Sequence, residues 1–158
     1  MRIIVISDTH RDLGSLLGIV EKHKEEAAMF IHLGDGEREC DDVLSLYPDL
    51  PLICIRGNCD MASMAPTTKI ITARNINIFC CHGHTQSVKY GTDTLLRAAR
   101  ENGCTIALYG HTHVGVTNYI DGIHLMNPGS PSCPRQGPRS YGVIDIVDNG
   151  IMTFLVEV

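Results

Sequence analysis

The sequence predicts an α/β fold, and three features of the pattern support that prediction. Five short apolar runs rich in Ile, Val and Leu are closed by glycine or polar residues, which is typical of buried strands. Helical patterns separate the first three runs, as in a parallel sheet with right-handed crossovers. The second half contains tight-turn signals between alternating segments, which predict antiparallel strands. The five runs cover residues 3–7, 29–34, 52–57, 76–81 and 105–110.

The first half alternates these strands with helices. An apolar stripe over residues 13–20 predicts the first helix, and Asp12 is expected to cap its N-terminus. A second helix is expected over about residues 40–46, because Pro48 disfavours its continuation. Residues 37–39 are expected to be the solvated start of this helix.

The second half changes character after one more helix. That helix is expected over residues 92–102 and ends where a glycine follows Asn102. The antiparallel strands that follow can form a second sheet or extend the first one. No linker or change in composition divides the chain, so residues 1–158 are expected to form a single domain. The paired strands are 116–120 with 123–126, and 141–147 with 151–156.

Composition narrows the class of protein. The chain has 158 residues, of which 44% are apolar and 20% are charged, so it is expected to be globular. Its net charge of −5 and the lack of a Lys/Arg cluster argue against nucleic acid as the main partner. Seven cysteines without a Cys-x-x-Cys spacing favour a reducing compartment, so a cytoplasmic location is expected. No apolar run is long enough to span a bilayer, so no membrane partner is expected.

Each of the five buried runs ends within a residue or two of a side chain that can bind a metal. In order along the chain, these side chains are Asp8, Asp35, Asn58, His82 and His111. Ligands of such sheets bind outside the carboxyl ends of the strands. Five ligand-type side chains at five strand ends therefore predict a converging metal site.

Three of these ligand-type residues, Asp8, His82 and His111, are each followed by a histidine two positions on. His113 follows His111, and a pair of histidines at a strand end is difficult to explain by packing alone. His10 follows Asp8, but this spacing by itself is more typical of a turn with a surface histidine. Metal ligation is the stronger interpretation for His111 and His113 taken alone, whereas for Asp8 and His10 only the whole set makes it so.

The ordered set Asp-x-His, Gly-Asp, Gly-Asn, His-Gly-His and Gly-His-x-His resembles the calcineurin-like metallophosphoesterase superfamily. The resemblance runs from the first strand to the stretch Asn127-Pro128-Gly129-Ser130. The short chain and that stretch look most like the small bacterial and archaeal phosphodiesterase subfamily. The resemblance implies a four-layer α/β/β/α sandwich, in which two packed mixed sheets are flanked by helices.

The same resemblance implies two divalent metal ions that share the bridging ligand Asp35. Manganese is the first choice, and nickel, iron, cobalt or zinc also suit a set of nitrogen and oxygen ligands. Asp35 and Asn58 are also assigned as catalytic residues, and a hydroxide that bridges the ions is expected to attack the phosphorus atom. The implied ligands are Asp8, His10, Asp35 and His113 for one ion, and Asp35, Asn58, His82 and His111 for the other.

The implied activity is hydrolysis of a small phosphorylated molecule, with a phosphodiester favoured. A phosphomonoesterase is the alternative within the enzymes, and the alternative outside them is a metal-binding scaffold such as the retromer subunit of eukaryotes. That subunit has lost metal ligands, whereas all seven ligand positions are filled here. His84 and Arg135 are candidate substrate contacts, although packing for the first and a solvated loop for the second are nearly as favoured. Exposed strand edges leave a homodimer as one option.

Position 59 departs from the family pattern. Many relatives place a histidine directly after the asparagine, where it is thought to protonate the leaving group, but this chain has Cys59 followed by Asp60. A thiol is a poorer proton donor than an imidazole at neutral pH. Weak activity on substrates with poor leaving groups is therefore expected. A covalent role for the thiol is disfavoured, because the metals already supply hydroxide.

The remaining histidines are expected to be structural or solvated. His32 lies inside a predicted strand and is expected to be a satisfied core residue. His23 and His124 are expected to lie on the surface.

Overall fold

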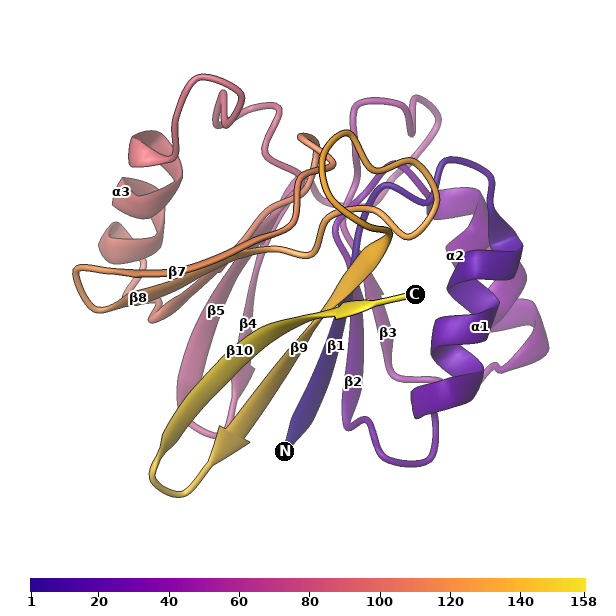
Figure 1. The fold of residues 1–158 in the computed structure, drawn as a ribbon, viewed down its shortest axis with the longest axis horizontal. Coiled ribbons are helices and arrows are strands. Elements are labelled where there is room, and N and C mark those ends of the chain that lie inside the picture. The colour runs from indigo at the N-terminus through magenta and orange to yellow at the C-terminus, as the bar shows by residue number, and fades with distance from the viewer.

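Two mixed five-stranded sheets pack face to face in the computed structural model, which describes residues 1–158 (Figure 1). The first sheet has the strand order β10-β9-β1-β2-β3 and the second has the order β4-β5-β6-β8-β7. The first contains β1 (Arg2–Ile6), β2 (Met29–His32), β3 (Leu52–Cys54), β9 (Ser140–Val147) and β10 (Gly150–Glu157). The second contains β4 (Thr68–Ala73), β5 (Ile76–Cys81), β6 (Ile106–Leu108), β7 (Val116–Ile120) and β8 (Ile123–Asn127).

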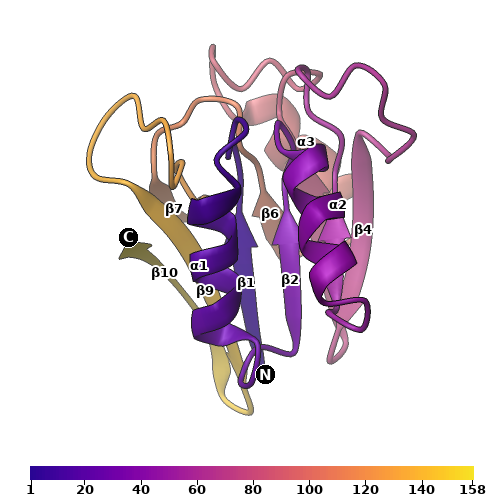
Figure 2. The same cartoon turned by 90° about the vertical axis from the view of Figure 1, so that its right-hand side faces the viewer.

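Helices cover the outer face of each sheet. Helices α1 (Leu13–His23) and α2 (Glu37–Leu46) lie on the first sheet, as Figure 2 shows, and α3 (Asp93–Glu101) lies on the second. The expected four-layer α/β/β/α sandwich is therefore confirmed. The expected cap of α1 is also confirmed, because the backbone N–H of Ser15 donates to Asp12 Oδ1 at 3.0 Å.

Three apolar layers hold these four layers of structure together. Side chains alternate along β1, so Ile3 and Val5 enter the core between the sheets while Ile4 and Ile6 pack beneath α1 and α2. A third apolar cluster, which includes Leu95, joins α3 to the second sheet. Burial on both faces explains why the central strands are almost entirely apolar in sequence.

The two predicted hairpins end up in different sheets. Strand β9 pairs antiparallel with β1, so the β9–β10 hairpin extends the first sheet. Strand β8 pairs parallel with β6, so the β7–β8 hairpin completes the second sheet. Both options that the sequence left open are thus used.

The structure differs from the sequence-based expectation at three places. Strand β4 was not expected, because it lies at the edge of the second sheet, half of its residues are exposed and its apolar run is short. Helix α2 begins at Glu37, three residues earlier than expected, and Glu39 in its first turn is buried instead of solvated. His23 is also buried, since its ring contacts Tyr141 Oη through Nε2 at 2.8 Å.

None of the three helices combines the length and the apolar character that a membrane span requires.

Candidate metal centre

The loops that follow β1, β2, β3, β5 and β6 meet at one end of the sandwich, at the top of Figure 1. Parallel pairing places the ends of β1, β2 and β3 on one edge of the first sheet, and the ends of β5 and β6 on the same edge of the second. The strand-end side chains identified in the sequence therefore converge across the interface between the sheets.

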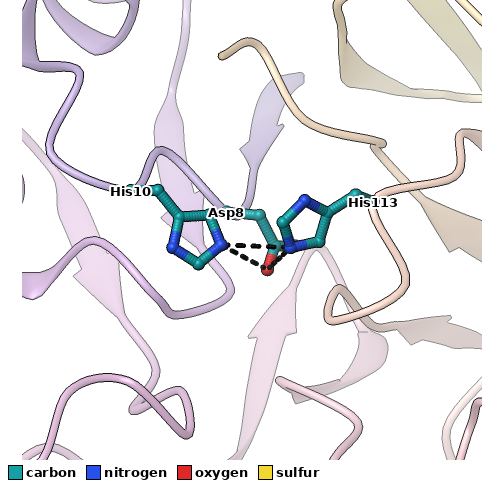
Figure 3. A group of neighbouring side chains, drawn as sticks. All are labelled: Asp8, His10 and His113. Atoms are coloured by element: carbon teal, nitrogen blue, oxygen red, sulfur yellow. Dashed lines mark hydrogen bonds and ion pairs between the residues drawn. The ribbon is translucent and has the colours of Figure 1, made fainter. Parts of the chain in front are cut away.

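One group of side chains forms where the loop after β1 meets the loop after β6. Figure 3 shows His10, His113 and Asp8 turned toward a common point. The Nε2 atoms of His10 and His113 are 3.0 Å apart. Asp8 Oδ1 lies 3.2 Å from His113 Nε2 and 3.8 Å from His10 Nε2. Atoms that share one zinc-sized ion lie about 3 Å apart, because each is about 2 Å from the metal, so this group fits a divalent cation.

A second group lies next to the first and shares a carboxylate with it. Asp35 Oδ2 is 3.8 Å from His10 Nε2 and 3.4 Å from His82 Nε2. Asn58 Oδ1 is 3.1 Å from His82 Nε2. The ring of His111 lies 5.0 Å from that of His82, measured between centroids. Asp35 therefore faces both groups, and so does Asp8, whose Oδ1 lies 4.0 Å from His82 Nε2.

A buried carboxylate oxygen in the first group lacks a hydrogen-bond donor. Asp8 is fully buried, and its Oδ2 accepts the backbone N–H of His111 at 3.0 Å. Its Oδ1 accepts no hydrogen bond. An unsatisfied ionised oxygen in the interior is costly unless a cation pairs with it, so this atom fits a metal ligand.

The backbone at the centre adopts an uncommon conformation. Five residues of the two groups have φ in the left-handed region, at 58° for Asp8, 45° for His10, 57° for Asp35, 67° for His111 and 57° for His113. Left-handed φ is unfavourable for residues other than glycine and clusters at functional sites. The conformation turns each chain sharply at the strand end, so the side chains face inward.

Two glycines allow the loops to approach this closely. A Cβ added at Gly57 would lie 2.1 Å from Asp35 Oδ1 and 2.3 Å from the Asp35 backbone nitrogen. A Cβ at Gly110 would lie 1.9 Å from Ser7 Oγ and 2.8 Å from Asp8 Oδ2. Neither position can carry a side chain without displacing a carboxylate of the centre.

Two acidic residues position the loops, and the sequence pattern did not identify them in this role. Asp60 Oδ2 accepts the backbone N–H groups of Asp35 and Gly57, each at 2.8 Å. Glu39 is buried, and its Oε1 accepts from Thr9 Oγ1 at 2.8 Å. Asp60 therefore ties the loop after β3 to the loop after β2 instead of serving only as a neighbour of position 59.

The Asn-Pro-Gly-Ser stretch supports the opposite side of the centre. Asn127 donates through Nδ2 to the carbonyl of Gly110 at 2.9 Å and to Thr112 Oγ1 at 3.0 Å. Ser130 Oγ donates to the carbonyl of Asp8 at 2.7 Å. This stretch thus holds both loops of the first group in register.

Electrostatics keep the two carboxylates and His111 in the form that binds metal. Burial opposes ionisation of Asp35, but contact with His82 holds the pKa of that carboxyl well below its usual range. Burial also opposes ionisation of Asp8, and the neighbouring His113 outweighs it and lowers the pKa. Burial, aided by the charge of His82, lowers the pKa of His111 to about 4, so that imidazole is neutral at pH 7. Burial opposes protonation of His82, but contact with Asp35 outweighs it and raises the pKa of that ring. Contact with Asp8 raises the pKa of His113, so a metal ion would displace a proton at these two rings.

The thiol of Cys59 lies at the edge of the centre and stays protonated. Burial, together with a hydrogen bond to Asp35, raises its pKa to about 11. The backbone N–H of Cys59 donates to Asp35 Oδ1 at 2.7 Å, and Asn58 Nδ2 donates to its sulfur at 3.2 Å. A protonated thiol is a weak nucleophile, which agrees with the expectation that it takes no covalent role.

The other candidate residues occupy different places. The ring of His84 lies 6.1 Å from that of His111, and its buried Nδ1 has no hydrogen-bond partner. Arg135 is exposed, and its backbone N–H donates to the carbonyl of His113 at 3.1 Å. His32 is fully buried and lies 3.1 Å from Thr9 Oγ1 through Nε2, which confirms the expected core histidine.

Comparison with known proteins places this geometry in context. The family model of the calcineurin-like phosphoesterase superfamily domain matches residues 1–149. The probable metallophosphoesterase YsnB of Bacillus subtilis is 30% identical over 148 residues, which cover 92% of this chain and 85% of that protein. The phosphodiesterase YfcE of Escherichia coli is 34% identical over 104 residues, which cover 60% of this chain and 52% of that protein.

Solved structures share the fold over nearly the whole chain. A conserved uncharacterized protein of Streptococcus pneumoniae, a predicted phosphoesterase, superposes with a TM-score of 0.87 at 27% identity, covering 99% of this chain and 88% of that chain. Vps29 of Entamoeba histolytica superposes with a TM-score of 0.77 at 21% identity, covering 100% and 99% of the two chains. At that identity the second likeness concerns the fold alone.

Proposed function

The chain belongs to the calcineurin-like phosphoesterase superfamily, and we propose that it is a phosphodiesterase that uses two metal ions to hydrolyse a small phosphorylated molecule. Membership makes it a metal-dependent phosphoesterase, and its candidate metal-binding residues suit divalent ions. Beyond this, we propose that the chain binds two ions, that manganese is its first choice, and that it prefers diesters.

The observation that carries the proposal is the shared position of Asp35. Its Oδ2 lies within 4 Å of His10 Nε2 on one side and of His82 Nε2 on the other. One carboxylate can therefore contact two ions, one beside Asp8, His10 and His113, and one beside Asn58, His82 and His111. When bound, two such ions lower the pKa of a water molecule toward neutrality and stabilise the charge that develops on a phosphoryl group.

The protein itself supplies orientation. His82 Nδ1 lies 2.9 Å from the carbonyl of Leu33, and His113 Nδ1 lies 2.7 Å from that of Cys133. Each contact suits a donated N–H that leaves Nε2 free as a ligand atom, the usual support for a metal-bound histidine. Asn58 contributes a neutral carbonyl oxygen, so the set carries only two negative charges and retains a positive surplus for an anionic substrate. His84 lies beside His111, and the backbone of Arg135 contacts that of His113. Both residues are proposed as substrate contacts.

A direct test uses aryl substrates and controlled metal content. The purified protein would be stripped with a chelator, dialysed and assayed with bis(p-nitrophenyl) phosphate and p-nitrophenyl phosphate, with and without manganese. We expect no activity without metal, recovery with manganese and a higher kcat/KM for the diester. Full activity in the stripped protein would contradict the metal mechanism.

Two alternatives predict different outcomes in the same assay. A phosphomonoesterase would cleave p-nitrophenyl phosphate faster than the diester. A scaffold would bind metal without turning over either substrate. The filled set of seven ligand positions favours an enzyme, because loss of ligands is what a scaffold tolerates.

A further inference from the structure

A cavity of about 390 Å³ opens directly beside the metal centre. His10 and Asp35 form the wall that it shares with the centre. The opposite wall comes from residues 36–39 at the start of α2 and from residues 59–62 after β3. A molecule whose phosphoryl group lies at the metal centre can therefore extend into this cavity, whose volume suits part of a small ligand.

The carboxylates on the opposite wall, those of Glu37, Glu39 and Asp60, already accept hydrogen bonds within the protein. Glu39 accepts from Thr9 Oγ1 at 2.8 Å and from the backbone N–H of Arg11 at 2.6 Å. Glu37 accepts from Ser63 Oγ. Asp60, as described, accepts backbone N–H groups of neighbouring loops. Hydrogen-bond donors thus stabilise all three negative charges, and none of the three forms an ion pair with an arginine of the cavity.

The two arginines that line the cavity are free by comparison. Arg11 and Arg38 are exposed, and neither guanidinium donates a hydrogen bond or pairs with a carboxylate. Arg2, Arg74 and Arg100 form ion pairs with carboxylates, whereas the other arginines of the chain do not. A guanidinium offers a planar fork of donors that matches a phosphate group.

The backbone of Arg11 shows that its position is specified. Its φ is 71°, a left-handed value that costs free energy for a residue of this size. Arg11 is not among the proposed metal ligands, so ligand geometry does not explain the conformation. The bond from its N–H to the buried Glu39 holds the strained turn, and at this position Arg11 lines the cavity.

We propose that this cavity is a subsite for a second phosphate group of the substrate, bound by Arg11 and Arg38. The substrate is then a phosphodiester whose alcohol portion carries a further phosphate, and not a simple diester. This inference rests on the proposed function, because it assumes that the scissile phosphoryl group lies at the metal centre.

The test compares two aryl diesters that differ by one phosphate. These are thymidine 5′-(p-nitrophenyl phosphate) and the same compound with a 3′-phosphate. We expect wild type to favour the second compound in KM by about 10- to 100-fold, the range for hydrogen bonds to charged groups. Arg38→Gln and Arg11→Gln should each reduce this ratio. The matched control is Arg97→Gln, an exposed arginine of α3 on the opposite side of the molecule, which should preserve the ratio (Figure 1).

A binding experiment separates this inference from the proposed function. Calorimetry of the manganese-loaded protein would compare thymidine 3′,5′-bisphosphate with thymidine 5′-phosphate, and Arg38→Gln should weaken only the preference for the bisphosphate. If that preference exists but neither diester is hydrolysed, the proposed function fails and the subsite stands. If diesters are hydrolysed but the 3′-phosphate changes neither KM nor affinity, the subsite is wrong.

Discussion

Most non-glycine residues with a left-handed backbone conformation lie in two regions of this molecule, the loops of the metal centre and the hairpin turns at strand ends. In the β4–β5 turn, Arg74 and Asn75 have φ of 47° and 65° and are exposed. In the metal centre the same conformation falls on buried residues such as Asp8 and Asp35. A hairpin turn needs positive φ to match the twist of its strands, whereas the centre needs it to aim side chains.

The difference shows what each region is built for. The turns could adopt glycine at these positions with little loss, since Arg74 and Asn75 are exposed and the ion pair of Arg74 with Asp148 lies in solvent. The centre keeps Asp and His at strained positions and places glycines next to them. Asp60 accepts and Asn127 donates further hydrogen bonds that hold these loops. The strain of the centre is therefore supported from several loops at once.

The largest expected effect comes from Asp35, the proposed shared ligand of the two metal ions. Asp35→Asn should lower kcat/KM by at least about 1,000-fold, equivalent to about 4 kcal/mol of transition-state stabilisation, because it weakens both sites. His10→Ala should lower kcat/KM clearly less, since His10 is proposed as a ligand of one ion only. Steady-state kinetics at saturating manganese would measure both. Equal losses in the two variants would refute the bridging role.

Glycine substitutions compare the two regions directly. Gly57→Ala should lower kcat/KM by about 100-fold, because the added Cβ displaces Asp35 and small misplacements of catalytic groups carry costs of this size. Gly122→Ala, at φ 85° in the β7–β8 turn with nothing within 4 Å, should reduce the free energy of unfolding by about 1 kcal/mol. Its kcat/KM should stay at the wild-type value. Denaturant unfolding and kinetics of both variants provide the measurement.

The next effect concerns leaving groups. Wild type should cleave aryl diesters much faster than alkyl diesters, because the protonated Cys59 is a poor match for a general acid and a phenolate leaves without a proton. Cys59→His should narrow that gap by at least about tenfold, within the range of general acid catalysis. Cys59→Ala should leave aryl diester cleavage near wild type. Complete loss of aryl activity in Cys59→Ala, with both metals bound, would instead assign the thiol a direct part.

The two histidines after β6 should serve different ions. His113 lies against Asp8 and His10, whereas the ring of His111 lies beside that of His82. Each single alanine variant should retain about one metal ion per chain, which elemental analysis after gel filtration can count. Loss of both ions in both variants, in a protein that still melts cooperatively, would contradict separate assignments.

The smallest effect is expected in the hairpin region. Arg74→Gly should raise the free energy of unfolding by about 0.5 to 1 kcal/mol, because glycine adopts the left-handed conformation without strain. The change removes an ion pair with Asp148 at 3.3 Å, but exposed pairs of this kind contribute little. Thermal and urea unfolding would detect the gain, and kcat/KM should not change. A loss of stability would show that the turn is not strained at this residue.

Sequence patterns predicted most of the elements because most of them are strongly apolar or strongly periodic. Strand β4 was not predicted, because an edge strand with half of its residues exposed has only a short apolar run. The buried Glu39 and His23 were expected in solvent, because a charged or polar residue in sequence carries no sign of the partner that will satisfy it. Those partners, Thr9 and Tyr141, are 30 and 118 residues away.

The sequence by itself determined which residues can bind a metal, their order along the chain, and their positions at the ends of buried strands. That information is local, because apolar runs and glycine punctuation are properties of neighbouring residues. Tertiary structure alone decided which side chains meet, how Asp60 and Asn127 hold the loops, and that Arg11 and Arg38 line a cavity beside the centre. These features depend on how two sheets pack and on hydrogen bonds between loops far apart in the chain, and no local pattern encodes such distances.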